Sequence, residues 1–143
     1  MNKQGFGAIG ERLAEKYLTK NGYKILAKNC KFLGAELDIV AMLTKKVQAK
    51  KIKADLKAGK YKSKEAVKYM INSLQDKIVF IEVKFSSTRV YGEPYERVDL
   101  NKQKQIAKAA QMFIYKNKLD NIECRFDVIS IVGNEINHIE NAF

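Results

Sequence analysis

Several residue types are scarce in this chain of 143 residues, and their scarcity excludes some kinds of functional site and some classes of protein. The single histidine, His138, excludes a metal site with several histidine ligands. The two cysteines, Cys30 and Cys124, lack the spacing of a zinc or redox motif, so we expect both to be reduced. No window approaches the ~20 apolar residues of a membrane span, and no export signal is recognisable at the N-terminus. We expect a soluble, cytoplasmic protein without a membrane partner.

The chain also has little that would divide it into domains. It contains one proline, Pro94, and no linker, internal repeat or low-complexity tract. Its length is that of one domain and is sufficient to bury a sizeable core. We predict a single domain over residues 1–143.

Basic charge is abundant and unevenly placed. The net charge is +11, and residues 43–77 hold 11 lysines against three acidic residues, a net charge of +8. The rest of the chain has 16 basic and 13 acidic residues, which leaves +3. Such a field attracts polyanions, so nucleic acid is the first partner to consider and an anionic membrane surface the second. A solvated face that keeps the protein soluble predicts the same composition.

Apolar periodicity predicts the order helix, three strands, helix, two strands. The helices are expected over residues 6–20 and 101–118, and the strands over 23–29, 36–42, 78–85, 125–132 and 136–143. In the second strand, alternation places Leu37, Ile39 and Ala41 on one face and Glu36, Asp38 and Val40 on the other. The expected fold class is α/β, with a mixed sheet flanked by helices.

Residues 44–77 interrupt this pattern and predict a helical hairpin inserted between the second and third strands. Val67, Met70, Ile71 and Leu74 form the apolar stripe of its second helix, and Ser63 is available as the cap. We expect Lys50, Lys51 and Lys53 to extend a DNA-binding surface outward from the domain. The alternative is that the apolar stripe docks on the domain or on a second copy while the lysines only maintain solubility.

The third strand carries opposite charges inside an apolar segment. Glu82 and Lys84 share one face, because side chains alternate along a strand. If the second and third strands pair antiparallel, Asp38 can lie across from Glu82 at the ~4.8 Å spacing of neighbouring strands. Two carboxylates and the Val83 carbonyl would suit Mg²⁺, with Mn²⁺ as a substitute. Lys84 would orient water or stabilise charge on a phosphate during phosphodiester hydrolysis.

A plainer interpretation stays open for these residues. Glu82 and Lys84 are equally explained as a salt-bridged pair at a sheet edge, and Asp38 as a residue at the end of a strand. The order of several motifs along the chain favours the catalytic interpretation over this one.

That order resembles the YraN family of small bacterial proteins, which is similar to Holliday-junction resolvases within the PD-(D/E)XK nuclease-like superfamily. The resemblance rests on Gly10-Glu11, Glu36-Leu37-Asp38, Phe80-Ile81-Glu82-Val83-Lys84, Arg125-Phe126-Asp127-Val128 and the segment 136–143. It implies a restriction-endonuclease-like core, with Asp38, Glu82 and Lys84 in metal-binding and catalytic roles and Glu11 as a helix-borne carboxylate of the site. Glu11 is equally explained as a solvated glutamate that suits the helix dipole.

Other candidate residues are less specific. Phe85-Ser86 stands where the family tends to have Thr-Arg, and Arg89 is expected to replace that arginine. Lys102, Lys104 and Lys108 of the later helix are expected to contact phosphates, although a solvated helix face predicts the same residues. Glu36 shares a face with Asp38 and is a candidate outer ligand of the site, but we expect it to be exposed. We expect His138 to be a hydrogen-bonded strand residue and not a general base.

The sequence thus predicts a Mg²⁺-dependent DNA endonuclease. Analogy with resolvases suggests branched or recombination intermediates as its substrates and a homodimer as its assembly. Two other classes stay open. One is a non-catalytic nucleic-acid-binding module of the same fold, and the other is a protein-interaction domain.

Overall fold

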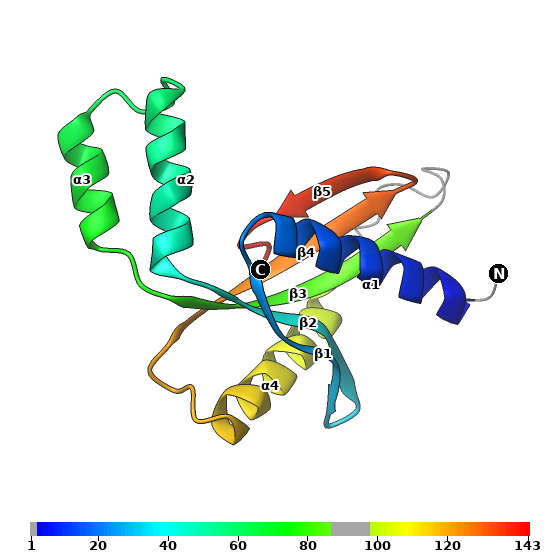
Figure 1. The fold of residues 1–143 in the computed structure, drawn as a ribbon. Coiled ribbons are helices and arrows are strands. Elements are labelled where there is room, and N and C mark those ends of the chain that lie inside the picture. Colours follow the sequence, from blue (N-terminus) through cyan, green and yellow to red (C-terminus); the bar gives the residue numbers. More distant parts are fainter. Residues whose placement is uncertain (1–2, 87–97) are drawn as a thin grey trace.

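The computed structural model describes residues 3–86 and 98–143 as a mixed sheet between helices (Figure 1). The elements in chain order are α1 (Lys3–Lys20), β1 (Lys24–Phe32), β2 (Ala35–Leu43), α2 (Lys45–Lys57), α3 (Lys64–Asn72), β3 (Lys77–Ser86), α4 (Leu100–Lys116), β4 (Glu123–Val132) and β5 (Glu135–Ile139).

The five strands lie in the sheet in their order along the chain, from β1 to β5. β3 and β4 are parallel and are connected by way of α4, whereas the other neighbouring strands are antiparallel. β3 is therefore the central strand, with β2 and β4 on its two sides.

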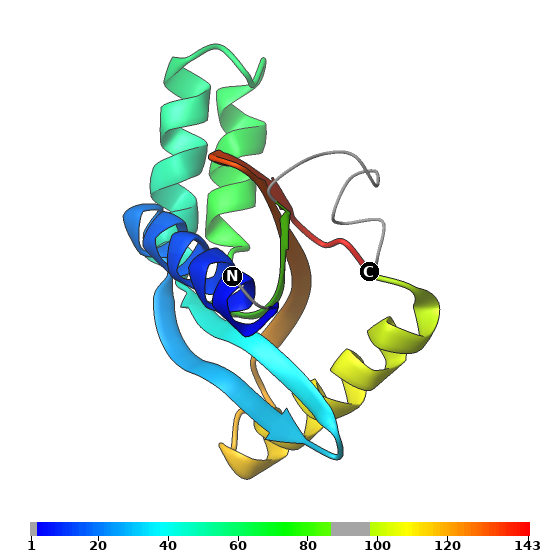
Figure 2. The ribbon, with the colours of Figure 1, turned by 90° about the vertical axis from the view of Figure 1, so that its right-hand side faces the viewer.

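Two apolar cores lie on opposite faces of the sheet. On one face, Ala14 and Leu18 of α1 pack with Ile39, Val79 and Ile129 of the strands. On the other face the buried side of α4 meets the sheet at residues that include Val40, Ile78 and Phe80. The two helices thus lie on opposite sides of the sheet, as Figure 2 shows.

The α2–α3 hairpin projects from one end of the sheet (Figures 1 and 2). Thr44 and Ser63 cap the two helices through hydrogen bonds from the N–H groups of Val47 and Ala66. None of the described residues of α2 is buried, whereas Val67 of α3 is. The base of the hairpin is held by Asp76, which accepts a hydrogen bond of 2.8 Å from the Lys45 N–H.

The predicted α/β class, mixed sheet and element order are confirmed, and the arrangement is consistent with a nuclease-like core. The inserted hairpin is also found, although α3 ends at Asn72 and Leu74 lies beyond it. The last strand was predicted too long, because β5 ends at Ile139. The final residues instead turn back onto β4, where the Ala142 N–H donates to the Phe126 carbonyl and the Phe143 ring stacks on the Phe126 ring.

The predicted faces of β2 are wrong at Leu37. Ile39 and Ala41 pack in the core on the α1 side, but Leu37 packs in the core on the α4 side. The alternation is interrupted at Asp38, and Asn29 of the neighbouring β1 has a φ angle of 53° at the facing position. Period-two reasoning assumes a regular strand, so it fails where the backbone departs from extended geometry.

Among residues 3–86 and 98–143, no helix combines the length and the apolar composition that crossing a bilayer requires.

Because Gly10 has no side chain, α1 can approach β3 closely at this position. A Cβ at this position would lie 2.8 Å from the Cβ of Phe85 in β3, whereas a Cβ at Gly7 of the same helix would meet nothing within 4 Å. Gly10→Ala should therefore lower the free energy of unfolding by about 1–3 kcal/mol. Gly7→Ala should raise it by up to about 1 kcal/mol through helix propensity. Urea denaturation of both variants measures this, and equal effects would contradict the close packing of α1 on β3.

Candidate metal centre

Asp38 lies where the pairing between β2 and β3 ends. The paired residues run from Leu43 and Lys77 to Ile39 and Ile81, so Asp38 and Glu82 occupy the next positions. There the Asp38 carboxylate, rather than a backbone carbonyl, accepts a hydrogen bond of 2.8 Å from the Val83 N–H. The predicted proximity of Asp38 and Glu82 on neighbouring strands is therefore present.

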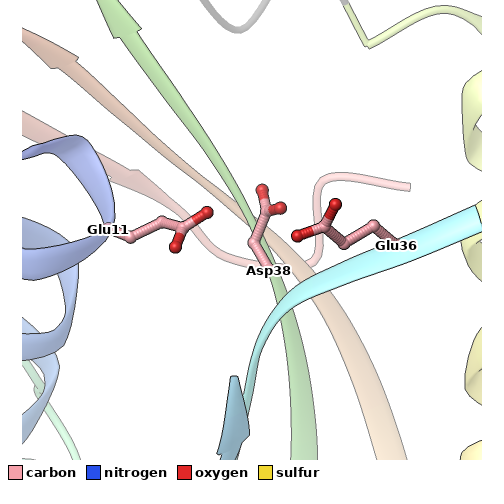
Figure 3. Close-up of side chains that lie close together, drawn as sticks. All are labelled: Glu11, Glu36 and Asp38. Atoms are coloured by element: carbon pink, nitrogen blue, oxygen red, sulfur yellow. The ribbon is translucent and has the colours of Figure 1, made fainter. Parts of the chain in front are cut away.

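Two further carboxylates converge on Asp38 (Figure 3). Glu11 comes from α1, and Glu36 precedes Asp38 by two residues in β2. One carboxylate oxygen of each of the three residues lies within 4.8 Å of those of the other two. We call these three residues together with Glu82 the acidic cluster. The expectation that Glu36 is simply exposed is wrong, because its half-buried side chain points toward Asp38.

Burial and nearby negative charge change the titration of Asp38 and Glu11. Burial and then the neighbouring Glu82 carboxylate together raise the pKa of Asp38 to about 8, against the opposing hydrogen bond from the Val83 N–H. Burial also raises the pKa of Glu11, and Glu36 and Glu82 add to this effect. A hydrogen bond from Asn29 acts in the opposite direction on Glu11. The cluster thus holds carboxylates whose mutual repulsion the protein only partly offsets.

Two lysines face Glu82, whose side chain is 6% exposed. The Lys84 Nζ lies 3.3 Å from a Glu82 carboxylate oxygen, and the Lys102 Nζ of α4 lies 3.8 Å from the same atom. Glu82 and Lys84 thus form the ion pair of the plainer interpretation, but they do so on the central strand and not at a sheet edge. The pair therefore lies within the sheet, beside the acidic cluster.

The donor set fits a hard divalent cation. Carboxylate oxygens are the ligands that Mg²⁺ and Mn²⁺ prefer, and these come from two strands and a helix. A cation among them would offset the repulsion that raises the pKa of Asp38. The Val83 carbonyl stays a predicted ligand. The Val83 N–H points toward Asp38, and in antiparallel pairing the N–H and C=O of one residue face the same neighbouring strand.

The predicted nucleic-acid contacts lie at several places. Lys102 reaches the acidic cluster, whereas Lys104 and Lys108 are exposed elsewhere on α4. Lys50, Lys51 and Lys53 are exposed on α2, and Arg89 lies outside the described residues.

A second buried carboxylate is Asp127 of β4, a residue of the Arg125-Phe126-Asp127-Val128 motif for which the sequence predicts no role. It is fully buried and accepts hydrogen bonds from both Nε and Nη2 of Arg125 at 2.8 Å. It also meets His138 Nε2 at 2.7 Å and accepts from the Asn141 N–H at 3.0 Å. His138 is thus a hydrogen-bonded residue of β5, as expected.

This network extends to α1 and to the start of β1. Arg125 donates to the Tyr23 hydroxyl at 2.9 Å, and the Tyr17 hydroxyl lies 3.2 Å from His138 Nδ1. Burial alone would raise the pKa of Asp127, but the hydrogen bonds from His138, Arg125 and Asn141 together hold it below its usual range. In the sequence this network is visible only as an arginine two residues before an aspartate on the same strand. The other residues that contact Asp127 are distant in the sequence and could not be predicted from this spacing.

The raised pKa of Asp38 predicts a pH-dependent cost to the metal-free fold. An ordinary Asp ionises near 3.8, whereas Asp38 ionises near 8 in the folded chain, so wild-type protein loses stability as the pH rises through this interval. Asp38→Asn lacks this loss. The free energy of unfolding of Asp38→Asn minus that of wild type should therefore increase from about pH 5 to about pH 8, as measured by urea denaturation with a chelator present. A difference that stays constant with pH would contradict the buried, carboxylate-flanked position of Asp38.

Replacing Asp127 should have the opposite effect on stability, because its pKa is lowered in the folded chain. Asp127→Ala leaves the Arg125 guanidinium without its buried partner and should cost about 3–5 kcal/mol, measured by urea denaturation near neutral pH. Asp120→Ala, at an exposed position before β4, is the control with little expected effect. The contribution of Asp127 is full above the usual Asp pKa of 3.8 and is lost as the pH falls through its lower folded-state pKa. Equal stability of the two variants would show that the network does not hold the fold.

Comparison with known proteins gives a consistent family assignment. A model of the uncharacterised protein family UPF0102 matches residues 10–131. A UPF0102 protein of Caldanaerobacter subterraneus is 34% identical over 150 residues, which cover 100% of this chain and 98% of the relative. One of Clostridioides difficile is 34% identical with full coverage of both chains, and one of Clostridium tetani is 38% identical over 95% of this chain and 85% of its own length. The chain therefore belongs to the UPF0102 family, the YraN family that its motifs resemble.

Proposed function

We propose that this protein hydrolyses phosphodiester bonds in DNA with the help of a divalent cation held by the acidic cluster. The observation that carries the proposal is the convergence of Glu11, Glu36 and Asp38, with Glu82 beside Asp38 and 3.3 Å from Lys84. Buried carboxylates crowded together destabilise a fold, and a module that only binds a polyanion has no use for them. A cation site that meets a phosphate accounts for both the carboxylates and the lysine.

The carboxylates and Lys84 would have different roles in such a reaction. Asp38 and Glu82 would hold Mg²⁺ or Mn²⁺, with Glu11 and Glu36 as further carboxylates near it. When bound, the cation supplies polarisation of the scissile phosphate and a lower pKa for a bound water. The Lys84 ammonium, 3.3 Å from Glu82, would orient the attacking water or stabilise negative charge that develops on phosphate oxygens.

DNA as the substrate is supported by charge. The chain has a net charge of +11, and Lys102 brings a second ammonium group to within 3.8 Å of Glu82. Lys104 and Lys108 on the same helix are exposed and available to phosphates outside the cluster. Branched or recombination intermediates are the proposed form of the substrate, by analogy with resolvases. Resolvase-like action on them would use two sites and hence a homodimer.

The test is cleavage of linear, flap and four-way DNA with Mg²⁺ or Mn²⁺. Asp38→Asn, Glu82→Gln and Lys84→Ala should each lower the rate by roughly hundredfold or more, because each removes a group that holds the cation or stabilises charge. Circular dichroism confirms that each variant is folded.

The matched controls are Glu15→Gln and Lys16→Ala, which lie on α1 just beyond Glu11 and outside the acidic cluster. Both should keep wild-type rates. Equal cutting by all variants would assign the activity to a contaminant. Binding without cutting would favour a non-catalytic module of the same fold, and no binding at all would favour a protein-interaction domain.

A further inference from the structure

A groove lies at the C-terminal end of α1, next to the point where the chain leaves β2 and begins α2. Its volume is about 710 Å³, within the range of sites that hold small ligands. The walls come from the last turn of α1, from α2 and the chain after α3, and from residues of β4 and β5. We call it the basic groove, and its lining includes Tyr17, Lys20, Tyr23, Val47, Lys50, Lys51, Ile52, Asp55, Tyr61, Leu74, Lys77, Arg125, His138 and Glu140.

The charge of the basic groove favours an anion. Five basic side chains line it. Arg125 pairs with the buried Asp127 and Lys77 lies 3.9 Å from Glu123, which leaves Lys20, Lys50 and Lys51 against the two acidic residues of the lining, Asp55 and Glu140. Both acidic groups already have cationic neighbours. Asp55 lies 3.1 Å from the Lys60 Nζ, and Glu140 lies 3.8 Å from Arg125 and 3.9 Å from Lys51. The lysine-rich α2 forms one wall, so the field of residues 43–77 adds to the local charge.

Aromatic and apolar side chains share the same groove. Tyr17 and Tyr61 are half-buried, and Val47, Ile52 and Leu74 are half-buried apolar residues of its lining. Tyr17 is held in place by its contact with His138, whose ring centroid is 5.6 Å from that of the tyrosine. The groove therefore offers surfaces on which a flat ring can pack, next to ammonium groups that can bind phosphates.

We propose that the basic groove binds single-stranded nucleic acid. Cationic grooves interleaved with aromatic rings bind single strands because every base has a face for stacking and every linkage carries a phosphate. A groove of this volume has room for one or a few unpaired nucleotides. The proposal goes beyond the nuclease function, since it does not require the acidic cluster to be catalytic.

The two sites are separate but near each other along α1. Glu11 of the acidic cluster and Tyr17 of the basic groove are six residues apart, which is about 9 Å along the helix axis. A strand held in the groove would thus lie close to the acidic cluster if both proposals hold. Binding by the groove can be measured in the presence of a chelator, where the cluster holds no cation and no cleavage takes place.

The first test compares two lysine pairs on α2. Lys50 and Lys51 line the basic groove, whereas Lys46 and Lys57 are exposed on the same helix and do not line it. Binding of a fluorescent oligothymidylate is measured by anisotropy with EDTA and about 0.15 M salt, where screening confines charge effects to ~8 Å. Lys50→Gln with Lys51→Gln should weaken binding roughly tenfold and lower the salt slope by about 1.4. Lys46→Gln with Lys57→Gln should change the affinity by no more than about twofold. Equal losses for both pairs would overturn the proposal.

The second test concerns stacking. Tyr61→Ala should weaken binding roughly five- to hundredfold if a base stacks on this ring. Tyr69→Ala, at a position 77% exposed on α3 and outside the groove, should leave the affinity unchanged. An unchanged affinity of the Tyr61→Ala protein would overturn the proposal.

Competitors identify the occupant. Unlabelled oligothymidylate should displace the probe, whereas thymidine monophosphate and polyglutamate of equal charge should displace it at least tenfold less well. Displacement by the mononucleotide at a similar concentration would make the groove a small-molecule site. Displacement by polyglutamate would make it a site for acidic polypeptides, and tighter binding of a duplex of equal length would make it a duplex site. Each of these three results contradicts the proposal.

Discussion

The hydrogen bond from the Val83 N–H to the Asp38 carboxylate is the contact on which the proposed site depends. It lies where β2 and β3 stop pairing, and a buried backbone N–H at such a point needs an acceptor. Asp38 provides that acceptor and is thereby held beside Glu82 of β3 and near Glu11 of α1. The acidic cluster is thus built into the sheet, and its position follows from the register of the two strands and from the close approach of α1 that Gly10 permits.

Two aspartates in this fold, the half-buried Asp38 and the fully buried Asp127, differ in what surrounds them. Asp127 accepts from Arg125 and Asn141 and meets His138, and these hydrogen bonds outweigh burial and lower its pKa. Asp38 meets one backbone N–H and other carboxylates, so its pKa is raised. Asp127 therefore stabilises the fold near neutral pH, whereas Asp38 destabilises it until a cation or a proton is bound. This contrast supports the assignment of a functional role to Asp38 and a structural role to Asp127.

Much of the fold could be predicted from the sequence because its elements are regular. Period-two and helical apolar patterns gave the element order, and the charges in the apolar segment around Glu82 identified the strand that carries the candidate site, although not its central place in the sheet. The faces of β2 were predicted wrongly at Leu37, because the irregular backbone beside Asn29 leaves no trace in the pattern. Glu36 was correctly placed on the face of Asp38 but was expected to be exposed, because the sequence does not show that Glu11 of α1 meets it there. The partners of Asp127 and the basic groove depend on contacts between distant segments, which one sequence does not reveal.

The α2–α3 hairpin carries much of the basic charge of the chain, but the candidate site lies in the acidic cluster, at the end of the β2–β3 pairing. The central claim is that the carboxylates of the acidic cluster hold a divalent cation. Crystals soaked in Mn²⁺ test this most directly through anomalous scattering. We predict a peak among these carboxylates in wild-type protein and its loss in Asp38→Asn. A wild-type map with no peak at this place, or with Mn²⁺ bound only elsewhere on the protein, would contradict the account.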